Sequence, residues 1–85
     1  MNAERKMRAK MRVTAIISTQ DSKTENLHFG AVYKNGAYPD DGSDEDNTFA
    51  KFTPSAHMSM QIANPALLGT FEVGQTFYVD FIPVS

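Results

Sequence analysis

Several residue types and sequence features are missing from this chain, and each absence excludes a class of protein. The 85 residues contain no Cys and no Trp. Without Cys there is no disulfide framework, no zinc–thiolate site and no thiol nucleophile, which fits a reducing compartment. No apolar run approaches the roughly 18 residues of a membrane span, and no apolar signal-peptide segment follows the basic start. We therefore expect a soluble protein without membrane contact that is not secreted through a signal peptide.

The chain also lacks the motifs of the common enzyme classes. A chain of 85 residues forms one domain whose interior is small. His28 and His57 alternate with apolar neighbours, as expected for solvent-facing positions on strands. The sequence contains no Gly-rich phosphate loop, no HExxH motif and no nucleophile elbow. These absences predict a non-enzymatic protein with no catalytic residues and no cofactor.

Charge is distributed unevenly along the chain, although the formal net charge is only -2. Five of the eight basic residues lie within the first twelve positions, whereas acidic residues concentrate at 40–46. Segments of opposite charge attract one another, either within a molecule or between neighbouring copies. We interpret residues 1–6 as a basic N-terminal arm and residues 7–85 as one small domain that carries an acidic loop at 40–47.

Alternating hydrophobicity predicts an all-β fold. The segments with strand-like patterns are 7–17, 27–33, 37–38, 48–53, 57–62 and 76–81. Ile16 interrupts the alternation of the first segment and indicates a β-bulge nearby. The motif "NPALLG" at 64–69 predicts one helical turn, with Asn64 as its cap and Gly69 at its left-handed end. We expect a small five- to six-stranded barrel or sandwich, with this short helical turn before the last strand.

The stretch "DDGSDEDN" at 40–47 is the segment that most resembles a functional site. Its five carboxylates belong to Asp40, Asp41, Asp44, Glu45 and Asp46. The spacing of a calcium hand requires Gly at the sixth position, but counting from Asp40 gives Glu45 there and counting from Asp44 gives Phe49. An irregular cation loop, a solvated self-repelling loop and a contact with a basic partner remain as interpretations. We assign no metal and treat the five acids as candidate binding residues for a basic partner.

A basic strand face provides the second candidate binding site. Arg8, Lys10 and Arg12 alternate on the first predicted strand, so their side chains are about 7 Å apart, close to the phosphate spacing of an extended nucleic-acid strand. Exposed aromatic side chains can stack on bases, and the candidates are Tyr33, Phe52 and Tyr78. The alternative interpretation is a solvated or partner-facing strand, which the net negative charge favours.

Three segments together carry a resemblance to a known group of proteins. They are "MRAKMRV", "YPDDGSDEDNTFAKFTPSA" and "NPALLGTFEVGQTFYVDF". In this combination the chain resembles small uncharacterised proteins of tailed phages and prophages, over residues 7–83. The resemblance implies a phage origin and brings no established activity, cofactor or catalytic residue with it.

A small all-β phage protein without catalytic motifs is expected to act by binding. The first hypothesis is an accessory protein of the virion that decorates or cements a capsid or tail, with the basic arm and the acidic loop joining neighbouring subunits. The alternatives are an intracellular inhibitor or sponge directed against a host defence system, and a small barrel that binds single-stranded nucleic acid. The expected partners are other copies of the chain or another phage or host protein, with nucleic acid less favoured. The expected location is the virion or the host cytoplasm.

Overall fold

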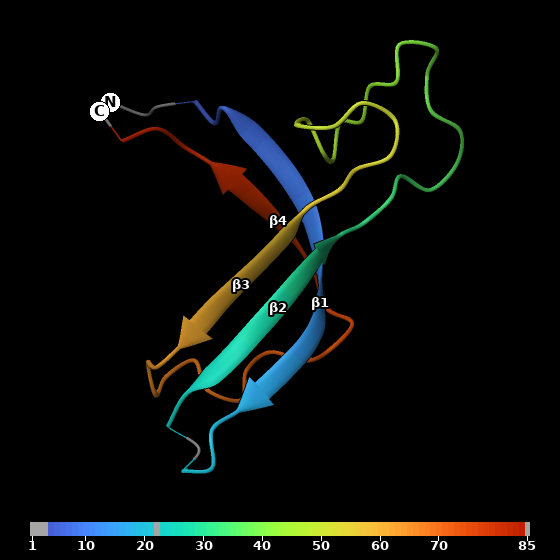
Figure 1. Ribbon diagram of the computed structural model, residues 1–85. Helices are drawn as coiled ribbons and strands as arrows, with labels where there is room; N and C mark the ends of the chain where they lie inside the picture. The colour runs from blue at the N-terminus through green and yellow to red at the C-terminus, as the bar shows by residue number, and fades with distance from the viewer. Residues whose placement is uncertain (1–3, 22, 85) are drawn as a thin grey trace.

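A computed structural model describes residues 4–21 and 23–84. It contains one antiparallel sheet of four strands in the order β3-β2-β1-β4 (Figure 1). The strands are β1 (Met7–Ser18), β2 (Glu25–Ala31), β3 (His57–Ile62) and β4 (Thr76–Phe81). The prediction of an all-β chain is therefore confirmed.

The prediction of a closed barrel or a two-layered sandwich is wrong. β3 and β4 lie at opposite edges of the sheet and do not pair with each other, and the molecule measures only 15 Å along its shortest axis. The short strands predicted at 37–38 and 48–53 do not form. Both belong to a long excursion between β2 and β3 that extends beyond one end of the sheet (Figure 1). Four strands are too few to curl into a barrel with a filled interior.

The predicted helical turn forms only a hydrogen-bonded turn, and no helix is present in the described part of the chain. The side chain of Asn64 accepts a hydrogen bond from the Ala66 N–H at 3.0 Å, and Gly69 has a positive φ of 75°. The turn that begins at Asn64 already ends at Gly69, so no further residues are available to extend it into a helix. No helix among residues 4–21 and 23–84 has the length and apolar character needed to cross a membrane.

The predicted bulge lies at Thr14, two residues before Ile16. Val13 pairs with Phe29 and Ala15 pairs with the preceding residue of β2, so one residue of β1 has no partner. The extra residue keeps Val13 and Ile16 on the same face of the sheet although they are three positions apart. Both ends of the 12-residue β1 therefore contribute to one apolar face.

The sheet has one apolar face and one polar face. The buried core is small and consists of Ala9, Met11, Val13, Leu27, Phe29 and Ile62. Phe49, Leu68 and Phe71 from the connecting segments cover part of this face. The alternate positions of β1, which include Arg8, Lys10 and Arg12, belong to the opposite face and pair in register with the polar residues of β4.

Candidate functional site

The end of the acidic stretch closes the free edge of β1. Only the second part of β1 pairs with β2, so the backbone of Arg8 and Lys10 needs other partners on that side. The Thr48 N–H donates to the Arg8 carbonyl at 2.9 Å, and the Arg8 N–H donates to Thr48 Oγ1 at 2.8 Å. The Lys10 N–H donates to Asn47 Oδ1 at 2.8 Å, and the Lys10 carbonyl accepts from the Val32 N–H at 2.9 Å. Residues 47–48 thus replace a strand that the fold lacks.

Two side chains of the acidic stretch are buried and belong to this edge closure. Asp44 is 4% exposed and Asn47 is 0% exposed. The Asp44 carboxylate accepts hydrogen bonds from the backbone N–H groups of Asp46 and Asn47 and from Asn47 Nδ2. Asn47 Nδ2 also donates to the Val32 carbonyl at 2.9 Å. Every polar atom of these two side chains therefore has an internal partner, which is what burial of polar groups requires.

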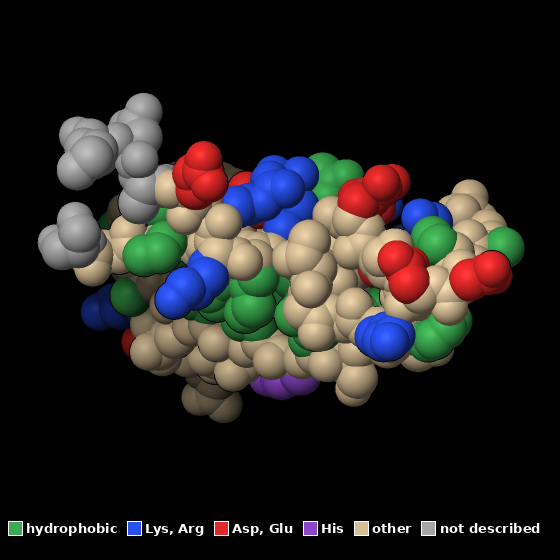
Figure 2. All heavy atoms as spheres, turned by 90° about the horizontal axis from the view of Figure 1, so that it is seen from above, with side chains coloured by type: hydrophobic (Ala, Val, Ile, Leu, Met, Phe, Trp, Pro, Cys, Tyr) green, Lys and Arg blue, Asp and Glu red, His purple; other side chains and the backbone are tan. Residues whose placement is uncertain are grey.

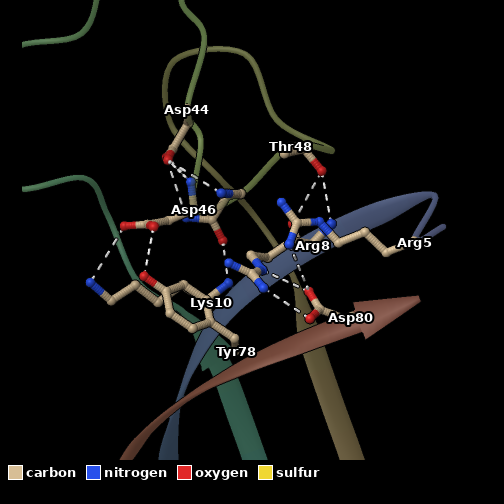
Figure 3. A network of polar contacts seen from close by, with 9 residues as sticks. Arg5, Arg8, Lys10, Asp44, Asp46, Thr48, Tyr78 and Asp80 are labelled. Carbon is tan, nitrogen blue, oxygen red and sulfur yellow. Dashed lines mark hydrogen bonds and ion pairs between the residues drawn. The ribbon is translucent and has the colours of Figure 1, made fainter. Parts of the chain in front are cut away.

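Asp46 connects the acidic stretch to the basic strand face, as Figure 3 shows. One of its carboxylate oxygens lies 3.5 Å from Lys10 Nζ. The other accepts a hydrogen bond of 2.9 Å from the Tyr78 hydroxyl. This hydrogen bond and the negative charge of Asp46 raise the pKa of Tyr78 above 10.0, because both disfavour the phenolate. Within one molecule, the two oppositely charged segments are therefore joined through Lys10 and Asp46.

Arg8 and Asp80 form the most complete ion pair of the polar face. Arg8 Nε and Nη2 donate to the two carboxylate oxygens of Asp80 at 2.7 and 3.0 Å, while Arg5 Nη1 lies 3.9 Å from the same carboxylate. The guanidinium carbon of Arg8 also lies 4.3 Å from the centre of the Tyr78 ring (Figure 3). Hydrogen bonding to Arg8 lowers the pKa of Asp80 below 3.8. Because the pair is accessible to solvent, its contribution to the free energy of unfolding is small.

The remaining candidate residues are exposed and are not brought together. Asp40, Asp41 and Glu45 all face solvent. Only Asp41 has a local partner, the Ser43 N–H at 3.0 Å, which lowers the pKa of its carboxylate. Arg12 is exposed and forms no ion pair with any described residue. On the face seen in Figure 2, basic side chains lie between acidic ones, with hydrophobic side chains visible among them.

Sequence patterns missed Asp80 as a member of the charged network. Asp80 and Tyr78 alternate on the polar side of the last predicted strand, so their outward direction was evident. Their partners depend on the register, in which Arg8 is opposite Asp80 and Lys10 is opposite Tyr78. The register follows from the pairing of two strands that are far apart in the chain, which no local pattern encodes.

A hollow on the apolar face offers a different kind of site. It has a volume of about 330 Å³ and lies between the first part of β1, the end of β4 and the segment that leads into β3. Its lining contains no Lys, Arg, Asp or Glu and includes Met7, Met11, Phe49, Ala56, Met58 and Phe81. Phe81 at the rim is 46% exposed. Such a surface is suited to receive an apolar side chain of another molecule.

Comparisons with protein-family models, with curated proteins and with solved structures found no match to this chain. Among residues 4–21 and 23–84 there is also no group of three or more His, Asp or Glu side chains close enough together to hold a metal ion. The charged network of the polar face and the hollow of the apolar face are candidate sites.

Proposed function

We propose that this chain is a non-enzymatic accessory protein of a phage particle, which decorates or cements a capsid or tail by binding protein. The observation that carries the proposal is the hollow on the apolar face, whose lining is mainly apolar and has no Lys, Arg, Asp or Glu, with Phe81 half exposed. Burial of a large apolar side chain contributes about 1.5–3 kcal/mol, and protein interfaces concentrate their binding energy in such pockets. The phage setting rests on the sequence resemblance, and the hollow supports the binding mode.

Charged groups have a secondary role in this proposal. Asp44 and Asp46 are held by partners within the chain, so they are not free to bind another molecule. The exposed Asp40, Asp41 and Glu45 remain for a basic partner surface, and Arg12 remains for an acidic one. Exposed charges change the rate and the salt dependence of association more than its strength. The partner is another copy of the chain or another phage or host protein.

Quantitative mass spectrometry of purified particles tests the proposal. The phage that encodes the chain is made to carry either Phe81→Asp or the matched control Val73→Asp. Val73 is 63% exposed and does not line the hollow. We expect the unaltered and Val73→Asp chains in the particles in a fixed ratio to the major capsid or tail protein. The Phe81→Asp chain should be at least tenfold less abundant, since a charge buried in the interface costs more than about 1.4 kcal/mol. Absence of the unaltered chain from particles would overturn the virion role, and equal incorporation of all three would overturn the role of the hollow.

A further inference from the structure

A second hollow lies on the polar face and is lined by basic side chains. It is an open depression of about 650 Å³ formed by the middle of β1, the start of β4 and the segment that follows β2. The residues that matter for its chemistry are Lys10, Arg12, Tyr33, Lys34, Asn35 and Thr76. Three of them are cations, and no Asp or Glu belongs to the lining. The hollow therefore has the charge and the volume of a binding site for a small anionic ligand.

The cations of this hollow are only partly neutralised by the protein itself. Within the described part of the chain, neither Arg12 nor Lys34 takes part in an ion pair. Lys10 has one ion-pair contact, with Asp46 at 3.5 Å, and that carboxylate is shared with the Tyr78 hydroxyl. The buried Asp44 of the neighbouring loop accepts internal hydrogen bonds, and with Glu45 it borders a separate hollow that Lys34 also lines. These hydrogen bonds leave the negative charge of Asp44 in place, so the cationic character of the hollow depends on Arg12, Lys34 and the partly paired Lys10.

The donor set matches a phosphate group next to an aromatic ring. Arg12 provides a planar fork of N–H donors, and Lys10 and Lys34 provide ammonium groups, which together suit the several oxygens of a phosphate. Asn35 and Thr76 add neutral donors at the rim. Tyr33 is 64% exposed, so its ring is free to stack on a planar base.

We propose that this hollow binds the phosphate of a nucleotide, with the base stacked on Tyr33. The nucleotide is either free in solution or part of a single-stranded nucleic acid, because both present the same phosphate and base. The proposal does not depend on the proposed protein-binding function, since it uses the polar face and none of the residues that line the apolar hollow.

Fluorescence anisotropy with a labelled oligothymidylate and with a labelled ATP analogue tests the proposal on the full chain at low salt. We expect saturable binding of one or both probes, weakened about tenfold by Arg12→Ala or Lys34→Ala, as for loss of a charge-assisted hydrogen bond. The matched control Lys23→Ala removes an exposed cation from the turn after β1 and should leave binding unchanged. For the oligonucleotide, the slope of log K against log salt should be about -0.7, as for one neutralised phosphate on a single strand.

Competition with unlabelled ligands identifies the source of the phosphate and the role of the ring. Tyr33→Ala should weaken nucleotide binding several-fold. The affinity for inorganic pyrophosphate, measured by competition, should stay unchanged, because pyrophosphate has no base to stack. Binding of the oligonucleotide without ATP assigns the site to a nucleic-acid strand, and binding of ATP without the oligonucleotide assigns it to a free nucleotide. Equal losses in Lys23→Ala and Arg12→Ala would indicate unspecific attraction and overturn the proposal, as would the failure of both probes to bind.

Discussion

The side-chain oxygen of Asn47 accepts a hydrogen bond of 2.8 Å from the backbone N–H of Lys10. A side-chain amide thereby takes the place of a neighbouring strand along the part of β1 that β2 does not reach. This relationship divides the acidic stretch into two groups. Asp44 and Asn47 are buried and maintain the fold, whereas Asp40, Asp41 and Glu45 are exposed and available for contacts with other molecules.

Replacement of Asn47 by Ala should destabilise the protein by about 3 kcal/mol. The substitution leaves the Lys10 N–H and the Val32 carbonyl without their partners, and each unsatisfied buried group costs about 1–3 kcal/mol. Urea unfolding followed by circular dichroism measures the change in the free energy of unfolding. Asn35→Ala, at an exposed position of the same excursion, should change it by less than about 0.5 kcal/mol. Equal stability of the two variants would show that Asn47 does not hold the edge of β1.

Neutralisation of the acids should separate them into two classes. Asp44→Ala is expected to destabilise the fold by about 2 kcal/mol, because the Asp46 N–H loses its side-chain acceptor and the two Asn47 donors each lose one of two acceptors. The triple variant Asp40→Asn, Asp41→Asn and Glu45→Gln should unfold at nearly the same urea concentration as the unaltered chain. A triple variant less stable than Asp44→Ala would contradict this division.

Asp80 should make stability depend on pH in the acid range. Its pKa in the folded state is lowered below 3.8, chiefly by the hydrogen bonds from Arg8. A carboxyl group with a lowered pKa stabilises the fold fully above its ordinary pKa, and this stabilisation is lost as the pH falls below 3.8 towards the folded value. Thermal unfolding of the unaltered chain and of Asp80→Asn should therefore differ most near neutral pH and converge as the pH falls below 3.8. A difference that persists or grows as the pH falls would contradict the assignment.

The pKa of Tyr78 should depend on Asp46. Its pKa is raised above 10.0, first through the hydrogen bond to Asp46 and then through the charge of that carboxylate. A raised pKa means that the folded state holds the proton more tightly, so the associated stability is present below pH 10 and is lost as the pH rises further. Asp46→Asn should shift the NMR titration of the Tyr78 ring to lower pH. An unchanged titration would show that the contact does not persist in solution.

Gly42 should not tolerate a side chain. It has a φ of +74°, and a Cβ at this position would lie 2.7 Å from the Phe52 ring and 2.8 Å from Lys51 Cγ. Gly42→Ala therefore combines backbone strain with a steric clash and should cost about 2 kcal/mol. Gly36→Ala is the matched control, since Gly36 also has a positive φ but its Cβ would meet no atom within 4 Å. Chemical denaturation should give Gly36→Ala the smaller loss, and a larger loss there would contradict the packing of this loop.

The four strands were predictable because each is mainly a run of alternating residues, although β1 contains a bulge and β2 begins and ends two residues earlier than predicted. "TFAKFT" has a similar alternation but forms no strand, because Asn47 and Thr48 are used as hydrogen-bonding partners of β1. Phe52 then adopts a positive φ of 62°, which ends any extended conformation. These outcomes depend on which edge of β1 lacks a partner, and this depends on the register of the whole sheet. The prediction of a barrel was wrong for the same reason, since local patterns do not encode whether the two edge strands of a sheet pair with each other.

For the candidate site, sequence located the residues of the charged network on β1 and in the acidic stretch but not their pairing. Arg8 was expected to be free for a partner, and the register instead places Asp80 opposite it. Asp44 was grouped with the exposed acids because nothing in "DDGSDEDN" distinguishes it from them. Burial separates these residues, and burial follows from the path of the excursion over the edge of β1.

The proposed protein-binding surface is tested most directly by NMR of chains labelled at the methionine methyl groups. Met7, Met11 and Met58 line the apolar hollow, whereas Met60 is on the same face of the sheet but outside the hollow and is 48% exposed. The chain is titrated with purified capsids and tails of the phage to which the proposed function assigns it. We predict that the signals of Met7, Met11 and Met58 shift or broaden while the signal of Met60 stays in place. Unchanged signals for the three methionines of the hollow, or changes confined to Met60, would contradict the account.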